Sequence, residues 1–279
     1  MKIRDYKITF IETLKDLYDN DEVENFFYLI LDNLKQISKV DLALNPKLEF
    51  SVEELNKIDF YLNELQKQKP IQYLLGSAHF FGLKLRVNPN VLIPRPETEE
   101  LVDWIINDNQ NKADLKILDI GTGSGAIAIA LAKNLKAEIT AFDISETALE
   151  TAQKNADLNQ VFVHFTEFDI LNDVWEGEKF DIIVSNPPYV RELEKSEINP
   201  NVLENEPHLA LFVPDNDPLI FYKKIADFAR NHLSKNGKLF FEINQYLGKE
   251  TIETLREEGF KNIHLKQDIY GNDRMILAY

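Results

Sequence analysis

The alternation of strands, loops and helices that begins at residue 116 constrains the fold more than any other feature of the sequence. The buried strand "LKILDI" leads into the loop "GTGSG" and the helix "AIAIALAKNL", and the strand "EITAFDI" precedes the helix "ETALETAQKNADLN". We expect further strands at "VFVHFTEFD", "FDIIVS" and "GKLFFEIN", and further helices at "PLIFYKKIADFARNHL" and "GKETIETLREEG". This alternation predicts a doubly wound α/β sheet. The segments "FKNIHLKQD" and "RMILAY" are expected to close it as an antiparallel hairpin.

The segment that precedes this alternation is expected to be helical and then to form a hairpin. Apolar residues recur with helical spacing at Phe10, Leu14, Leu17 and Tyr18, and again between residues 23 and 34. Ser51 and Glu54 have the spacing of a capping box that opens a third helix. Alternation of apolar and polar residues in "HFFGLKLRVNPNVLIP" predicts a β-hairpin. We therefore expect a helical bundle over residues 1–70, a β-hairpin linker over 71–95 and an α/β domain over 96–279.

The charge balance and the scarcity of metal ligands exclude several function classes. The chain has 31 Lys and Arg against 47 Asp and Glu, a net charge of −16, which disfavours nucleic acid as a substrate because phosphate is repelled. It contains no cysteine, and its five histidines lack metal-ligand spacing, so we predict no metal site. The first residues lack the apolar core of a signal peptide and no apolar run is long enough to cross a bilayer. We expect a cytoplasmic protein without membrane contact.

The glycine-rich loop between the first strand and helix of the alternating region predicts a nucleotide-like ligand. Gly121, Gly123 and Gly125 let the backbone approach a ligand at a helix N-terminus. About twenty residues later Asp143 ends the next strand, where its carboxylate can accept hydrogen bonds from ribose hydroxyls. Asp119 just before the loop favours the ammonium group of S-adenosylmethionine over a pyrophosphate. A glycine turn selected only for packing is the alternative interpretation.

The segment "SNPPYV" raises the question of why a strand ends on asparagine and two prolines. Each proline ends the strand and holds the residue before it extended, so the Asn186 amide and the Pro187 carbonyl lie side by side. A planar NH2 group can donate one hydrogen to each of these oxygens, and Tyr189 can pack on the flat group. Two acceptors would orient a poorly nucleophilic amide nitrogen and stabilise its developing positive charge. A stiff loop without chemistry is the alternative.

Five segments of the chain carry a family resemblance: "PIQYLLG", "VLIPRPETEELV", "LDIGTGSGAIAIALA", "SNPPYV" and "ENEPHLAL". Through them the chain resembles the release factor glutamine methyltransferases, the HemK/PrmC family, over nearly its whole length. The resemblance implies a class I, Rossmann-like methyltransferase sheet behind an N-terminal helical bundle that binds the substrate. It also implies S-adenosyl-L-methionine as cofactor, and as substrate the Gly-Gly-Gln glutamine of peptide chain release factors, methylated on its side-chain amide nitrogen (N5).

The same resemblance assigns the site residues. It implies catalysis by Asn186, Pro187 and Tyr189, and a substrate site formed by these three together with Pro188. Asp169 or Ile170, after the third strand, can meet the adenine. The cofactor residues implied are Gly121, Thr122, Gly123, Ser124, Gly125, Asp143, Ile170 and Asn186.

Three alternative functions stay open from the sequence. A related branch methylates a glutamine of a ribosomal protein, but differs where this chain has "RPETE". Enzymes that methylate adenine N6 in DNA or RNA also carry "NPPY", although the net charge opposes this function. A nucleotide-binding module without turnover is the third. We expect a monomer whose partner is a release factor and which makes no direct contact with nucleic acid.

Overall fold

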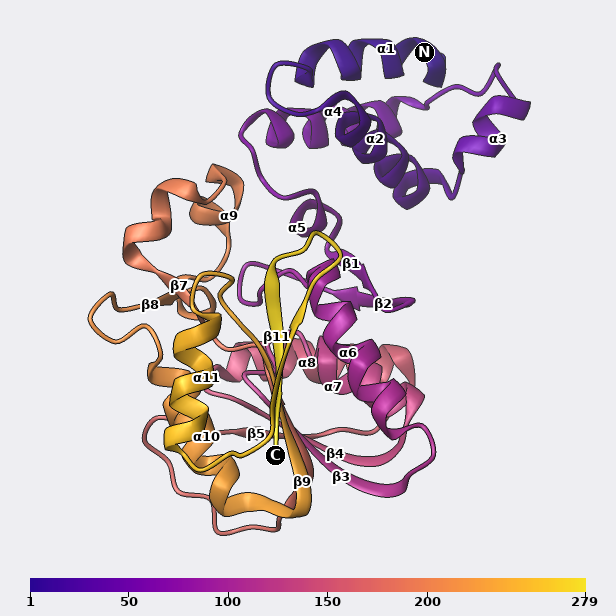
Figure 1. Cartoon of the computed structure of the whole chain (residues 1–279). Coiled ribbons are helices and arrows are strands. Elements are labelled where there is room, and N and C mark those ends of the chain that lie inside the picture. Colours follow the sequence, from indigo (N-terminus) through magenta and orange to yellow (C-terminus); the bar gives the residue numbers. More distant parts are fainter. The chain divides into compact units, whose positions relative to one another are not determined.

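The computed structural model describes residues 1–279 and divides them into two compact units. The smaller unit contains Met1–Gly76 together with Pro200–Asn205, and the larger contains Ser77–Asn199 and Glu206–Tyr279. Figure 1 traces the chain through both units. None of the helices combines the length and the apolar character needed to cross a bilayer.

The smaller unit is a helical bundle around its own apolar core. Its capping box is confirmed, because the Glu54 amide donates to Ser51 Oγ at 3.2 Å and the Ser51 amide donates to Glu54 Oε2 at 2.7 Å. The expectation that Leu17 continues the first apolar stripe is wrong, because the first helix ends at Leu14 and Leu17 lies in the following turn, 43% exposed. The helices are α1 (Ile3–Leu14), α2 (Asn20–Lys35), α3 (Lys39–Leu44), α4 (Val52–Gln66) and α5 (Ile71–Leu75).

The larger unit is built on a seven-stranded sheet in the order β10-β11-β9-β6-β3-β4-β5. The prediction of a doubly wound α/β sheet is confirmed, and so is the closing hairpin, since β11 runs antiparallel to both β10 and β9 while the other pairs are parallel. The strands are β3 (Ala113–Ile120), β4 (Lys136–Asp143), β5 (His164–Glu167), β6 (Phe180–Ser185), β9 (Leu233–Glu242), β10 (Ile263–Gln267) and β11 (Asp273–Ala278).

Helices cover both faces of this sheet, as Figure 1 shows for α6, α7 and α8 on one side and α10 and α11 on the other. Because side chains alternate along a strand, β6 sends Ile182 and Val184 into one core and Ile183 into the other. Burial on both faces explains why the central strands are continuous apolar runs. The helices are α6 (Pro96–Asn109), α7 (Ala126–Asn134), α8 (Glu146–Asn159), α10 (Ile220–His232) and α11 (Gly248–Glu257).

The predicted hairpin is present as β1 (Ser77–Phe80) and β2 (Leu83–Arg86) and belongs to the larger unit. The side chain of Asn155 joins it to α8, accepting from the Arg86 amide at 2.6 Å and donating to the Arg86 carbonyl at 2.9 Å. The hairpin is thus an integral part of this unit's structure.

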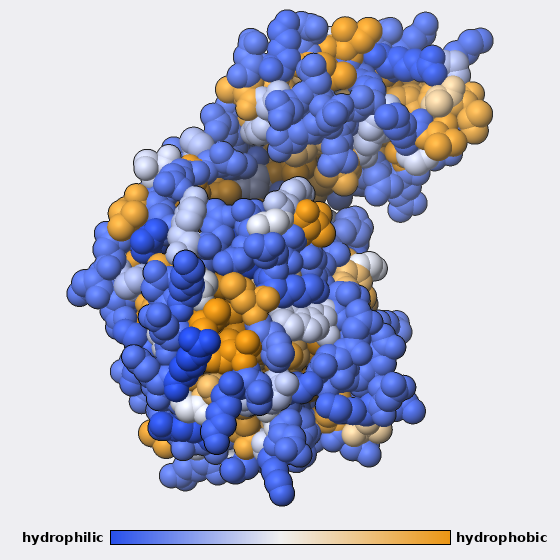
Figure 2. All heavy atoms as spheres, viewed as in Figure 1, coloured by the Kyte–Doolittle hydropathy of each residue, from blue (hydrophilic) through white to orange (hydrophobic).

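The segment after the "NPPY" loop has short elements that periodicity did not predict. They are β7 (Val190–Arg191), η1 (Glu192–Glu197), α9 (Pro200–Asn205), η2 (His208–Ala210) and β8 (Phe212–Val213), with β7 paired to β8. Elements of two to six residues are too short for a periodic signal. The face of the molecule in Figure 2 is mostly hydrophilic, in keeping with the net charge of −16, with apolar atoms gathered beside α11.

Candidate active site

A cavity of about 340 Å³ opens in the larger unit at the carboxyl ends of β3, β4, β5 and β6. Ligands of open α/β sheets bind at this edge. Several predicted site residues form its wall: Gly121, Gly123, Asp143, Ile170, Asn186, Pro187 and Pro188. Asp169 also lines it, whereas Thr122, Ser124, Gly125 and Tyr189 do not. The cavity therefore brings together residues from the glycine loop, the second strand and the "NPPY" segment.

The glycine loop is held open toward the cavity by Asp143. The Gly123 amide donates to Asp143 Oδ2 at 2.8 Å, and the Ser145 amide donates to Oδ1 at 2.9 Å. An added Cβ on Gly121 or Gly123 would meet no atom within 4 Å, and both residues have positive φ. Each carboxylate oxygen keeps a lone pair for a ligand hydroxyl. Burial raises the pKa of Asp143, and the two amide hydrogen bonds oppose that rise.

The other loop residues make their contacts in the protein interior and not at the cavity. Gly125 makes room for the neighbouring helix, because an added Cβ would lie 2.9 Å from Ile129 Cδ1 and 3.1 Å from Ala152 Cβ. Thr122 is buried and its hydroxyl donates to Asp119 Oδ2 at 2.6 Å. Asp119 is fully buried, burial raises its pKa to about 7, and its Oδ1 has no hydrogen-bond partner. The sequence placed Asp119 near the ligand, but its side chain is not part of the cavity wall.

The "NPPY" segment presents two oxygen acceptors at the cavity. Ser185 secures the strand end by donating from Oγ to the Ile120 carbonyl at 2.7 Å. The Asn186 side chain donates from Nδ2 to Thr98 Oγ1 at 3.4 Å, which leaves its Oδ1 available. The Pro187 carbonyl accepts no hydrogen bond from the surrounding backbone. Tyr189 instead turns its hydroxyl inward to Glu242 Oε1 at 3.1 Å.

Two sequence motifs that are distant along the chain meet beside this segment. The guanidinium of Arg95 pairs with the buried carboxylate of Glu206, whose Oε2 also accepts from the Ile93 amide at 3.1 Å. These contacts join "VLIPRPETE" to "ENEPHLAL". In the same motif Glu99 Oε1 accepts from the Phe81 amide at 2.9 Å. The "RPETE" side chains therefore tie neighbouring segments of the larger unit together.

Sequence reasoning missed two polar residues next to the cavity. Thr98 is 4% exposed and Glu242 2% exposed, and Thr98 Oγ1 donates to Glu242 Oε2 at 2.6 Å. The available signal for Glu242 was an acid at the end of an apolar strand, "KLFFE". For Thr98 it was a polar residue within the "RPETE" motif. Neither signal indicates that the two side chains form a hydrogen bond with each other.

The wall of the cavity fits an adenosine-bearing methyl donor. Gly121 and Gly123 offer open backbone, and the Asp143 carboxylate has acceptor capacity for hydroxyl groups. Ile170 supplies an apolar surface and Asp169 an acidic group next to it on the same wall. This combination of apolar surface and a few directed polar groups is typical of cofactor sites.

Comparison with known proteins decides the family. A release factor glutamine methyltransferase from Flavobacterium psychrophilum is 58% identical over 280 residues, which cover 99% of this chain and 98% of the relative. The chain belongs to the release factor glutamine methyltransferase family. The enzyme of that name from Bacteroides thetaiotaomicron is 44% identical, with 96% of each chain covered. The predicted resemblance is thereby confirmed.

Family domains and solved structures agree with this membership. Residues 9–76 match the PrmC N-terminal domain, and residues 100–209 match the methyltransferase small domain. The T. thermophilus 16S rRNA N2 G1207 methyltransferase, solved with AdoMet and guanosine, is 20% identical with a TM-score of 0.54, covering 72% of this chain and 49% of that one. A methyltransferase from Pyrococcus furiosus is 19% identical with the same TM-score of 0.54, covering 82% and 98%. These likenesses confirm the class I fold. As a release factor glutamine methyltransferase, the chain uses S-adenosyl-L-methionine, as expected from the sequence.

Proposed function

We propose that this enzyme methylates the side-chain amide nitrogen (N5) of the glutamine in the Gly-Gly-Gln motif of peptide chain release factors. The observation that carries the proposal is 58% identity to a release factor glutamine methyltransferase over 99% of the chain. The acceptor pair at the cavity agrees with it, because Asn186 Oδ1 and the Pro187 carbonyl suit a planar NH2 group. S-adenosyl-L-methionine supplies an electrophilic methyl group, which replaces one of the two amide protons.

The role we assign to Asn186 and Pro187 is to orient the substrate amide. Both lie in the cavity wall together with Asp143 and Gly123, so one ligand cavity contains both halves of the proposed site. Two acceptors hold both amide hydrogens, which fixes the orientation of the planar amide relative to the methyl donor and favours charge developing on nitrogen. Pro188 lines the same wall and supports the loop, and Tyr189 anchors it from inside through Glu242.

The cofactor residues are assigned on the same basis. Gly121, Gly123 and Asp143 are proposed to hold the ribose and methionine parts of S-adenosyl-L-methionine, and Ile170 to contact the adenine. Thr122, Ser124 and Gly125 are proposed to act through the shape of the loop, since they are buried outside the cavity wall.

We further propose that the helical bundle, residues 1–70, captures the protein substrate, and that residues 71–95, whose hairpin belongs to the larger unit, join it to the catalytic domain, residues 96–279. The support is that the bundle contains none of the cavity residues and that residues 9–76 match a family domain of their own. A single glutamine offers little contact area, so affinity for a whole release factor needs additional surface. The proposed enzyme acts as a monomer in the cytoplasm.

The experiment that tests the proposal follows transfer of a labelled methyl group. The full chain is incubated with labelled S-adenosyl-L-methionine and, separately, a release factor, a release factor whose Gly-Gly-Gln glutamine is changed to asparagine, ribosomal proteins, DNA and RNA. We expect label only in the unmodified release factor, with mass spectrometry placing it on that glutamine. Label in ribosomal protein or nucleic acid, with none in release factor, would overturn the proposal.

A further inference from the structure

A chain of hydrogen bonds leads from the Asn186 side chain into the interior of the larger unit. Asn186 Nδ2 donates to Thr98 Oγ1 at 3.4 Å, and Thr98 Oγ1 donates to Glu242 Oε2 at 2.6 Å. The other oxygen of the same carboxylate, Oε1, accepts from the Tyr189 hydroxyl at 3.1 Å. Glu242 therefore connects to both the first and the last residue of the "NPPY" segment. Thr98 and Glu242 are not among the residues of the cavity wall.

The direction of these bonds decides which end of the Asn186 amide faces Thr98. Burial raises the pKa of Glu242, and the positive charge of Arg274 opposes that rise. As a carboxylate Glu242 can only accept, and a threonine hydroxyl has one hydrogen, which Thr98 donates to Glu242. Thr98 Oγ1 then has only lone pairs to offer, so the NH2 end of Asn186 must face it. The oxygen of Asn186 is left for a ligand. Reversing the amide would place two acceptors together and leave a hydrogen bond unmade, which is costly near the interior.

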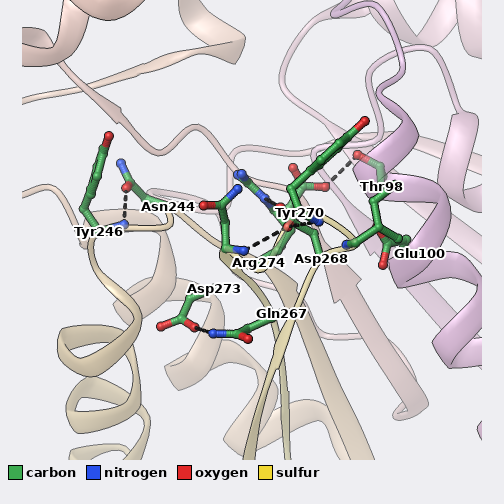
Figure 3. A network of polar contacts seen from close by, with 12 residues as sticks. Thr98, Glu100, Asn244, Tyr246, Gln267, Asp268, Tyr270, Asp273 and Arg274 are labelled. Atoms are coloured by element: carbon green, nitrogen blue, oxygen red, sulfur yellow. Dashed lines mark hydrogen bonds and ion pairs between the residues drawn. The ribbon is translucent and has the colours of Figure 1, made fainter.

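The register of the sheet places Glu242 beside the "NPPY" segment. In the parallel pair of β6 and β9, Ser185 lies opposite Phe241, so Asn186, which follows β6, and Glu242, the last residue of β9, are neighbours at the carboxyl ends of the two strands. Arg274 on β11 provides a compensating positive charge for the buried carboxylate and is itself held by Asp268 at 3.2 Å. Figure 3 shows Thr98 on α6 near the strand ends that carry Arg274 and Asp268.

We infer that Thr98 and Glu242 are positioning residues that hold the Asn186 amide with its oxygen toward the substrate. The inference rests on the proposed function of Asn186 as an acceptor for the substrate amide. Glu242 accepts the hydroxyl hydrogen of Thr98, so that Thr98 Oγ1 can only accept from the NH2 group of Asn186. Tyr189 donates to the other oxygen of the same carboxylate and so holds the far end of the loop. Neither Thr98 nor Glu242 needs to touch substrate or cofactor for this role.

The test compares Thr98→Val, which removes the hydroxyl at nearly constant shape, with Thr98→Ser, which keeps it. Thr98→Val should lower kcat for release factor methylation by about tenfold or more, because misorientation of a contact group impairs the reactive geometry. Thr98→Ser should restore most of this loss. The Kd of S-adenosyl-L-methionine should stay within about twofold in both variants, as expected for an interaction used in turnover. Thr251→Val is the matched control, since Thr251 is fully buried and its hydroxyl donates to the carbonyl of Leu247, the residue that caps α11.

A double-mutant cycle separates positioning from general destabilisation. If Thr98 acts through Asn186, adding Thr98→Val to Asn186→Ala should cause no further loss of rate in single-turnover assays. The inference would be overturned if Thr98→Val lowered the rate equally in the wild type and in Asn186→Ala, or if well-folded Thr98→Val kept full kcat.

A second readout needs no substrate and therefore stands apart from the proposed function. The side-chain NH2 resonance of Asn186 is recorded in the full chain labelled with ¹⁵N-asparagine and identified by its loss in Asn186→Ala. In the wild type and Thr98→Ser, one amide proton should be protected from solvent exchange, and Thr98→Val should lose that protection. Absence of release factor methylation by the wild type would refute the proposed function, whereas unchanged protection in Thr98→Val would refute the orientation by Thr98.

Discussion

Replacing Asp119 by asparagine should change how the stability of the enzyme depends on pH. Asp119 is fully buried, Thr122 and the Ala128 amide donate to its Oδ2, and its Oδ1 has no partner. Burial raises the pKa of this carboxyl from 3.8 to about 7, with the nearby Asp143 adding to the rise. Asp119→Asn keeps an acceptor for both donors and removes the titration.

The sign follows from proton binding. Between pH 3.8 and about 7 the folded protein keeps Asp119 protonated while the unfolded chain ionises it. The free energy of unfolding of the wild type therefore falls as pH rises through this window. Above pH 7 the stabilising contribution of the raised Asp119 pKa is lost. One pKa unit corresponds to about 1.4 kcal/mol, so between pH 5.5 and 7 the asparagine variant should gain about 2 kcal/mol relative to the wild type. That gain corresponds to about 4–8 °C in the Tm of a domain of this size.

The assay is a series of thermal melts of both proteins, without cofactor, from pH 5.5 to 8.5, where most other carboxyls stay ionised. The exposed substitution Asp16→Asn corrects for the change in net charge. The difference in Tm between Asp119→Asn and the wild type should widen up to pH 7 and then stay constant. Parallel curves over the whole range would refute the reasoning, because Asp119 would then be ionised when folded.

Four other predictions concern the site. Asn186→Ala should lower turnover by about a hundredfold or more with little change in Tm, and Asn186→Asp should retain more activity than alanine but less than the wild type, because it keeps the acceptor and loses the NH2 group that donates to Thr98; near-normal turnover by well-folded Asn186→Ala would reduce the motif to a stiff loop. Asp143→Ala should weaken S-adenosyl-L-methionine binding by about 1–3 kcal/mol in calorimetry, and unchanged affinity or tighter binding of a dinucleotide would contradict its role. Gly123→Ala and Gly125→Ala both place alanine at positive φ, but only the Cβ at position 125 would lie 2.9 Å from a neighbouring side chain, so Gly125→Ala should lower Tm more and Gly123→Ala should in addition weaken cofactor binding; equal melts for the two would contradict this. Removing residues 1–70 should impair methylation of intact release factor far more than cofactor affinity, and full efficiency of a folded truncated enzyme would assign the bundle another function.

The order of elements and the main ligand loop could be predicted from local sequence. The run from "LKILDI" through "GTGSG" to "AIAIALAKNL" encodes a buried strand, a turn that needs positive φ, and an apolar helix, each readable within a few residues. The same holds for the Ser51 capping box and for the end of β6 at Ser185, shortly before Pro187. The family resemblance likewise depended on short motifs that are visible in the chain itself.

Tertiary structure alone decided which polar side chains meet. Thr98 and Glu242 are 144 residues apart, and their contact depends on the register of β9 against β6 and on the packing of α6. Arg95 and Glu206 are separated by 111 residues, and no local pattern encodes their pairing. Periodicity and turn chemistry act over one element, whereas the partner of a buried charge is selected by the packing of several elements. For this reason the sequence predicted the Asn186 acceptor, and only the fold identified the residues that orient it.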